Sequence, residues 1–364
     1  MLTADNVLGV VKILIIVGAL LNVTPIMVWV ERRGSALIQD RVGPNRVGPF
    51  GLLQSFADAL KFILKEDVVP AQANKWLYTL APMFGLLPAL TTMAVIPWGR
   101  AFPLHNVRVA GHTFFEQPYL FDPIVTDANV GILVIFALAS LGVYGLATAG
   151  WASANKYSLF GGIRASAQMI SYELSLTLAA VAALMVAGSL RLTDVVHAQT
   201  GYFVLFGAVK IPAWNCFSPA MWLSMIVFIV AAFAETNRLP FDFAEAEAEL
   251  VAGYHTEYSS MKFALFFMAE YMAMAAMSAL IATLFFGGWD IPYWNEPATW
   301  WASLLTMGMF LMKVIAMLLV FVWVRWTIPR LKYDILMKIG WKVFLPMAIL
   351  NIILVAWFIA RRWI

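Results

Sequence analysis

The chain has 364 residues, of which 62% are hydrophobic and only 12% are charged, and its mean hydropathy is +0.80. This composition is far too apolar for the surface of a soluble globular protein, so it predicts an integral membrane protein. The net charge of +3 follows from the distribution of Lys and Arg among the loops and indicates no nucleic-acid partner.

Eight apolar segments of the length that a membrane-spanning helix needs follow one another along the chain. A continuous helix of about 20 apolar residues satisfies its own backbone across roughly 30 Å of hydrocarbon. The sequence therefore predicts an all-α polytopic membrane protein, with a single domain over residues 1–364. The predicted transmembrane helices are 7–30, 76–97, 128–149, 163–187, 219–234, 262–286, 300–324 and 343–360.

Lys and Arg residues are concentrated in the loops on one side of these helices. Cytoplasmic loops of membrane proteins carry the excess of positive charge, which places both termini outside. The first helix lacks a basic amino-terminal region and runs directly into Glu31-Arg32-Arg33, so we expect an anchor and not a removable signal. The predicted cytoplasmic loops are 31–75, 150–164, 235–262 and 325–342.

Several classes of cofactor are disfavoured by the residues present. A haem between helices needs facing axial ligands, but the four His residues all lie in predicted loops. The single cysteine, Cys216, cannot form an internal disulfide or hold an iron-sulfur cluster. We expect no haem, flavin, iron-sulfur cluster or metal in this chain, and no self-contained catalytic site.

The predicted loop 31–75 contains an amphipathic helix in the membrane interface. One interpretation is a surface anchor beside a cluster of positive charge. The other is that Asp58 and Lys61 face inward, with the helix covering a cavity whose mouth opens to lipid. The apolar positions are Leu52, Leu53, Phe56, Leu60, Ile63 and Leu64.

Two carboxylates fall inside predicted transmembrane helices. Glu173 lies near the centre of 163–187 and Glu270 lies within 262–286. A charge at the bilayer centre costs roughly 2.5 to 3.5 kcal/mol on insertion scales, so such residues normally face a polar interior. With Glu235 and Glu257 at helix ends they form a series suited to proton transfer, although structural hydrogen bonds would also explain them. Lys313 is either their cationic partner or a snorkelling residue.

The segment 233–260 packs six carboxylates into 28 residues between two apolar helices. Asn237 and Pro240 are expected to end the preceding helix. Acidic runs are usually solvated, but aromatic residues alternate with these acids and both ends are anchored in the membrane. An apolar slot with polar groups suits an amphiphilic ligand such as a quinone.

Three long strings carry a specific resemblance: ERRGSALIQDRVGPNRVGPFGLLQSFADALKFILKED, GWASANKYSLFGGIRASAQMISYEL and AETNRLPFDFAEAEAELVAGYHTEYSS. The chain resembles the H-subunit family of the proton-pumping NADH:quinone oxidoreductases, respiratory complex I. The resemblance implies a membrane-arm subunit that forms much of the quinone chamber and couples quinone reduction to proton translocation. It assigns to the chamber Glu31, Arg32, Asp58, Lys61, Arg238, Phe241, Asp242, Glu245, Glu247 and Glu249. It assigns to the proton pathway Glu173, Glu235, Glu257 and Glu270.

The resemblance also implies the surroundings of the chain. Quinone is the substrate, and electrons reach it from peripheral-arm subunits that carry iron-sulfur clusters and flavin. Other partners are membrane-arm subunits, including antiporter-like ones, and membrane lipid. The expected location is an energy-transducing membrane, such as the bacterial inner membrane.

One position departs from the family pattern. Some relatives carry a carboxylate in the third helix where this chain has Ser140, so Ser140, Tyr144 or water would have to bridge the proton pathway there. Two alternatives remain: the homologous subunit of a membrane-bound hydrogenase or of another quinone- or phenazine-linked dehydrogenase, and a proton-coupled secondary transporter with Glu173, Glu270 and Lys313 at a midplane site.

Overall fold

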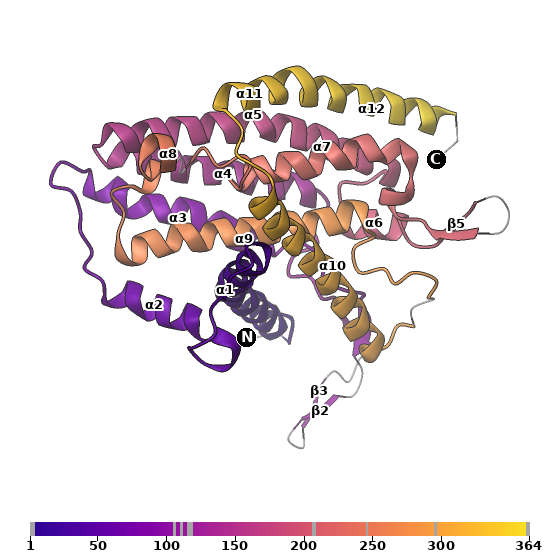
Figure 1. Ribbon diagram of the computed structural model, residues 1–364. Coiled ribbons are helices and arrows are strands. Elements are labelled where there is room, and N and C mark those ends of the chain that lie inside the picture. Colours follow the sequence, from indigo (N-terminus) through magenta and orange to yellow (C-terminus); the bar gives the residue numbers. More distant parts are fainter. Residues whose placement is uncertain are drawn as a thin grey trace.

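A computed structural model describes residues 4–104, 107–109, 112–114, 119–205, 209–244, 247–294 and 297–361. Long helices dominate it (Figure 1). Each of the eight predicted apolar segments corresponds to a helix. These are α1 (Ala4–Ile38), α3 (Lys75–Thr92), α4 (Gly131–Ala152), α5 (Lys156–Ala187), α7 (Pro219–Glu235), α9 (Ser260–Phe285), α10 (Trp300–Thr327) and α12 (Leu345–Ala360). α11 (Tyr333–Ile339) and the π-helical turn η4 (Gly340–Phe344) lead into α12.

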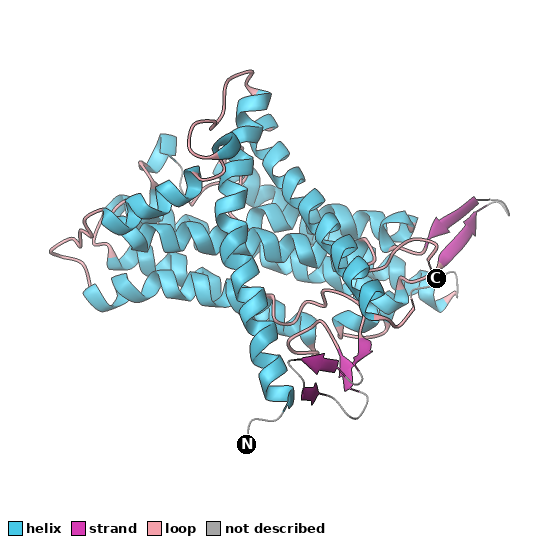
Figure 2. Ribbon diagram, turned by 90° about the horizontal axis from the view of Figure 1, so that it is seen from below, coloured by secondary structure: helices cyan, strands magenta, loops and turns pink. Residues whose placement is uncertain are grey.

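Short elements connect the long helices. The short helices are α2 (Gln54–Leu64), α6 (Leu192–Ala198), α8 (Glu247–Leu250), η1 (Pro49–Gly51), η2 (Asn215–Phe217) and η3 (Gly253–His255). Three antiparallel pairs of strands lie outside the helical body (Figure 2). They pair β1 (Phe102–Leu104) with β4 (Tyr119–Phe121), β2 (Val107–Val109) with β3 (His112–Phe114), and β5 (Tyr202–Leu205) with β6 (Val209–Pro212).

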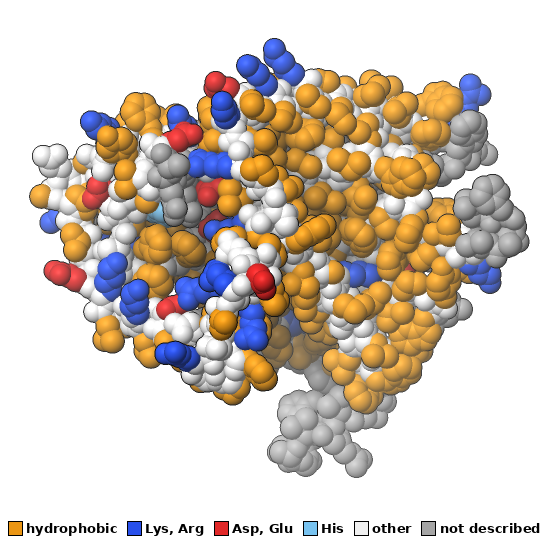
Figure 3. All heavy atoms as spheres, viewed as in Figure 1, with side chains coloured by type: hydrophobic (Ala, Val, Ile, Leu, Met, Phe, Trp, Pro, Cys, Tyr) orange, Lys and Arg blue, Asp and Glu red, His pale blue; other side chains and the backbone are white. Residues whose placement is uncertain are grey.

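Six segments of the described chain are long and apolar enough to cross a membrane: α1, α4, α5, α9, α10 and α11–α12. α3 and α7 are shorter, at 18 and 17 residues. Hydrophobic side chains cover most of the surface around α10 and α12, whereas charged ones gather toward the end with α2 and α8 (Figure 3). An apolar surface of this extent is typical of contact with lipid.

Helix ends follow local sequence. Asn155 Oδ1 accepts a hydrogen bond from Tyr157 N at the start of α5, and Gly188 ends that helix with a left-handed φ of 67°.

The predicted boundary of the first helix was wrong: α1 continues to Ile38, two turns beyond residue 30. Glu31 and Arg32 are therefore helical, and point from α1 toward different neighbours.

Glycines allow the central helices to approach closely. A Cβ atom on Gly145 of α4 would lie 2.9 Å from Gly85 N on α3. One on Gly162 of α5 would lie 2.9 Å from Leu146 O on α4. Such contacts let helix backbones approach each other in lipid, where the hydrophobic effect does not drive helices together, and here they pack α4 against both α3 and α5.

The connecting segments divide between two ends of the body. The segments after α1, α7 and α10 lie at the end with α2 and α8 (Figure 1). At the beginning of α1, Lys12 Nζ donates to Ile124 O over 3.1 Å, which places it beside the segment after β4. α12 ends at the same end of the molecule as β5.

Candidate functional site

A cluster of charged side chains is buried where α1, α9, α10 and the turn after α7 meet. Glu31 on α1 forms ion pairs with Arg325 at the end of α10 and, over 3.3 Å, with Arg238 Nη1. Arg238 Nε also lies 3.1 Å from Glu270 Oε1 on α9. The Tyr271 hydroxyl donates a hydrogen bond to the Glu31 carboxylate. Glu31 and Arg238 are only 5% and 4% exposed.

The composition of this cluster explains why its burial is tolerated. Removing an ion from water costs several kcal/mol unless a partner of opposite charge compensates it, and here two carboxylates face two guanidinium groups. The Arg238 guanidinium also lies 4.2 Å from the centre of the Tyr271 ring, a favourable cation–π contact. Burial opposes the charged form of Arg238, but Glu270, Tyr271 and Glu31 outweigh it and hold its pKa well above the usual value.

A cavity of about 420 Å³ lies between α1, α2 and α9. Its walls are mostly apolar, with contributions from Phe56 and Phe62 on α2 and Met268 on α9. Arg32 and Asp58 also line it and form an ion pair of 2.5 Å across α1 and α2. This volume falls in the range of ligand pockets, about 300–1,000 Å³.

A second cavity, of about 180 Å³, lies between the first cavity and the charged cluster. It shares Val28, Arg32 and Phe267 with the first cavity. Its other walls include Glu31, Tyr271 and Arg325. The two cavities are therefore neighbours, and the second one lies against the buried charges.

A third cavity, of about 80 Å³, lies on the other side of Arg238 and is lined by Glu235 and Glu270. It is large enough for ordered water. Glu173 is close enough to Glu235 to act on it electrostatically. Ser140 of α4, in turn, is hydrogen-bonded to Glu173 through its hydroxyl, whereas Tyr144 is 61% exposed.

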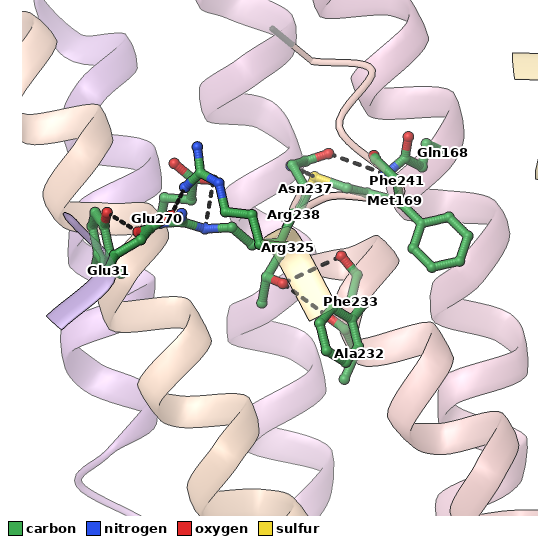
Figure 4. A network of polar contacts seen from close by, with 12 residues as sticks. Glu31, Gln168, Met169, Ala232, Phe233, Asn237, Arg238, Phe241, Glu270 and Arg325 are labelled. Carbon is green, nitrogen blue, oxygen red and sulfur yellow. Dashed lines mark hydrogen bonds and ion pairs between the residues drawn. The ribbon is translucent and has the colours of Figure 1, made fainter. Parts of the chain in front are cut away.

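The turn after α7 sends Arg238 and Glu235 in different directions. α7 ends at Glu235, and Asn237 takes a left-handed φ of 49°, which confirms the predicted helix break. The Thr236 hydroxyl donates to Ala232 O and Phe233 O (Figure 4). Figure 4 shows Arg238 directed from this turn toward Glu31 and Glu270.

Not all residues assigned to the chamber by resemblance lie in this cluster. Asp58 lines the 420 Å³ cavity, whereas Lys61 is exposed and is not among the residues that line it. Phe241 packs against Tyr172 on α5, with ring centroids 5.7 Å apart, and Asp242 is half-buried. Glu249 pairs with Arg164 at 2.7 Å in a solvent-accessible position.

Three more of the assigned glutamates, Glu245, Glu247 and Glu257, also lie apart from the charged cluster or outside what the structure describes. Glu245 lies outside the described residues, and Glu247 belongs to α8 but its side chain is not described. The Glu257 carboxylate accepts a hydrogen bond from Asn155 Nδ2 at the start of α5, a contact separate from the Glu270–Glu235 cavity.

Lys313 holds the loop that follows α9. Its ammonium donates to Gly288 O and Asp290 O at 2.9 and 2.8 Å, and it lies 4.0 Å from the centre of the Trp214 ring. Trp214 Nε1 donates to Asp290 Oδ2 over 2.8 Å. Burial raises the pKa of Asp290, against smaller opposing effects of Trp214 and Lys313. These contacts favour a structural role over the midplane partner that the transporter alternative requires.

Sequence reasoning missed the central place of Arg325 and Tyr271. Arg325 falls at the start of the predicted loop 325–342, where it contributes only to the positive charge, and Tyr271 simply follows Glu270 in the sequence. Arg325 lies in the last turn of α10, an apolar helix that also contains Lys313, and an arginine at such a helix end also suits simple snorkelling. Its pairing with Glu31, almost 300 positions earlier in the chain, has no local sequence signature.

The chain is similar to known proteins over nearly its full length. A family model described as NADH dehydrogenase matches residues 11–356. An NADH-quinone oxidoreductase H-subunit of Koribacter versatilis is 44% identical over 97% of this chain and 97% of its own length. The H-subunit of Salinibacter ruber is 46% identical, covering 94% of this chain and 93% of its own. An H-subunit of Geobacter sulfurreducens is 46% identical and covers 95% of this chain and 94% of its own length. The chain belongs to the NADH dehydrogenase family of membrane proteins represented by these NADH-quinone oxidoreductase H-subunits.

Proposed function

We propose that the chain is a membrane-arm subunit of a proton-translocating NADH:quinone oxidoreductase, in which it forms much of the quinone chamber and couples quinone reduction to proton transfer. The observation that carries the proposal is that the apolar cavity lies next to a smaller cavity lined by buried charges. The 420 Å³ cavity suits an isoprenoid tail, and the adjoining cavity beside Glu31, Tyr271 and Arg325 suits a polar head group.

The coupling is electrostatic. Two electrons and two protons convert a quinone into a quinol, and each electron that arrives before its proton adds negative charge inside a medium of low dielectric. Arg238 lies between Glu31, which lines the cavity, and Glu270, which lines the cavity shared with Glu235. A change of charge or proton affinity near Glu31 therefore acts on Glu270 through a shared guanidinium.

The proton pathway continues from Glu270 to Glu235, Glu173 and Ser140. The 80 Å³ cavity joins the first two carboxylates, and the Ser140 hydroxyl contacts the last. Ser140 then replaces the carboxylate that some relatives carry at this position. Glu257, beside Asn155, is a branch of the pathway toward the cytoplasmic surface.

The excess of Lys and Arg in the predicted loops 31–75 and 325–342 supports the proposed setting. Eight transmembrane helices, with α3 and α7 included, would leave both termini outside and α2 in the cytoplasmic interface, where its exposed Leu60 and Leu64 contact lipid. Peripheral-arm subunits with flavin and iron-sulfur clusters deliver the electrons. Antiporter-like subunits of the membrane arm are further partners, in a bacterial inner membrane.

Photoaffinity labelling of the intact complex tests the proposal. The complex is purified through a tag on this chain, and NADH:quinone reductase activity is measured with and without a photoreactive long-tail quinone. We expect labelled peptides from 21–32, 55–63 and 261–268, which line the cavity, and protection by excess natural quinone. Labelling confined to other peptides, or purification of the chain as a lone active transporter, would refute it.

A further inference from the structure

Gln168 is a buried polar residue that the proposed mechanism leaves unused. It lies on α5 with 0% of its surface exposed. Its Nε2 donates to Ala234 O and to Phe241 O, both over 2.8 Å, and lies 3.4 Å from Asn237 Oδ1 (Figure 4). One side-chain amide thus joins both ends of the turn after α7 to α5.

The orientation of this amide is fixed by its partners. Ala234 and Phe241 both offer carbonyl oxygens, which only accept hydrogen bonds, so the nitrogen has to face them. The Oε1 atom is buried and makes no hydrogen bond within the described part of the chain. Leaving a buried acceptor unpaired is unfavourable, and a leucine of similar volume would avoid that penalty. The amide offsets this penalty by fixing the position of the turn through its two hydrogen bonds.

The residues between the two tethered carbonyls are the ones that connect the two halves of the site. Glu235 follows Ala234 and lines the cavity shared with Glu270. Arg238 lies in the middle of the turn and pairs with Glu31 and Glu270. The two ion pairs of Arg238, at 3.1 and 3.3 Å, would weaken quickly if the backbone of the turn shifted. The turn therefore needs a contact with a neighbouring helix that keeps its backbone in place.

We propose that Gln168 is a positioning residue that holds the turn 234–241, so that Arg238 bridges Glu31 and Glu270 while Glu235 stays beside the third cavity. It contacts neither quinone nor a transferred proton. The inference rests on the proposed function, because its effect appears in the coupling of quinone reduction to proton transfer.

Two substitutions of similar size test this role in the intact complex. Gln168→Leu removes both donors. Gln168→Glu leaves one O–H donor when protonated, whereas the ionised form places negative charge against two carbonyl oxygens. The control is Ser175→Ala: Ser175 is also on α5 and 0% exposed, but its hydroxyl donates only to Tyr172 O within that helix.

The measurements are NADH:quinone reductase rate and proton pumping between pH 6 and 8, each normalised to electron transfer from NADH to ferricyanide, which does not need this chain. We expect Gln168→Leu to lose about tenfold or more of the reductase rate at every pH, as for other sub-ångström to ångström misplacements. The activity of Gln168→Glu relative to wild type should fall as pH rises. Each variant is compared with wild type at the same pH, because Glu235, Arg238, Asp242 and Tyr172 are present in all of them. Ser175→Ala should match wild type.

Each other outcome has a defined meaning. Wild-type rate and pumping in Gln168→Leu, or a ratio for Gln168→Glu that does not change with pH, would overturn the positioning role. Failure of both variants to assemble, while Ser175→Ala assembles, would also overturn it, in favour of a role in folding. A complex that contains the unmodified chain but lacks quinone reductase activity would contradict the proposed function itself, a result separate from these.

Discussion

Arg238 Nε lies 3.1 Å from Glu270 Oε1, and this contact joins two sets of residues that sequence reasoning had kept apart. Arg238 was assigned to the quinone chamber and Glu270 to the proton pathway. The same guanidinium reaches Glu31 beside the second cavity. The proposed chamber and the proposed pathway therefore share one cation, which gives the proposal a direct electrostatic link between the quinone and the first carboxylate.

Replacing Arg238 tests this shared cation. Arg238→Met removes the charge and leaves Glu270 without its guanidinium partner, and breaking a buried pair typically destabilises by about 3–5 kcal/mol. We expect quinone reductase activity to be nearly lost and the thermal stability of the complex to fall. Arg238→Lys keeps the charge but not the planar fork, so it should recover only part of the activity. Full activity in Arg238→Met, with ferricyanide reduction as the control, would exclude the bridge.

A matched pair on α2 tests the apolar cavity. Ala59 lines the 420 Å³ cavity and Ala57 does not, although both are exposed residues of the same helix. Ala59→Phe fills part of the cavity, so we expect a several-fold higher KM for a long-tail quinone and a smaller change for a short-tail analogue. Ala57→Phe should leave both KM values unchanged. Equal effects of the two substitutions would mean that the cavity does not take up the tail.

The contact between Ser140 and Glu173 gives a prediction for the proton pathway. Ser140→Ala removes the hydroxyl that faces Glu173, so proton pumping should slow several-fold, with quinone reduction slowed equally if the two are tightly coupled. Ser153→Ala is the control, because Ser153 follows α4 and its buried hydroxyl donates only to Ala149 O of that helix. Pumping at the wild-type rate in Ser140→Ala would show that the pathway bypasses this hydroxyl.

Cysteine labelling tests the orientation of the chain. Lys61 and Arg361 are both exposed, so we expect Lys61→Cys to react with an impermeant maleimide from the cytoplasmic face and Arg361→Cys from the outside. Burial raises the pKa of Cys216 to about 11, so little thiolate forms at pH 7 and this native cysteine should react slowly, faster as pH rises. Labelling of the two introduced cysteines from the opposite faces would reverse the topology.

Hydropathy located the long helices because each apolar segment is a local property of the chain. The break at Asn237 was also predictable from local residues. The end of α1 was not, because Glu31, Arg32 and Arg33 look like a loop until Glu31 is compensated by Arg325 from α10. Likewise, Gln168 on an apolar helix looks like any buried amide until the two carbonyls that it binds are known.

The same limit applies to Asp58 and Lys61. Asp58 and Lys61 are three residues apart, so helical spacing places them near one face. What separates them is Arg32, which pairs with Asp58 from α1 and satisfies its charge, while Lys61 remains exposed. Spacing within α2 cannot show which of two neighbouring charges finds a partner on another helix.

Proton pumping by Glu173→Gln tests the central claim most directly, that buried carboxylates of this chain couple quinone reduction to proton transfer. Gln has nearly the same shape as Glu but does not titrate, so packing and assembly should be preserved while proton transfer stops. We predict normal ferricyanide reduction, with quinone reduction and proton pumping lost together, and partial retention of both in Glu173→Asp. An assembled Glu173→Gln complex that pumps protons at the wild-type rate and ratio would contradict the claim.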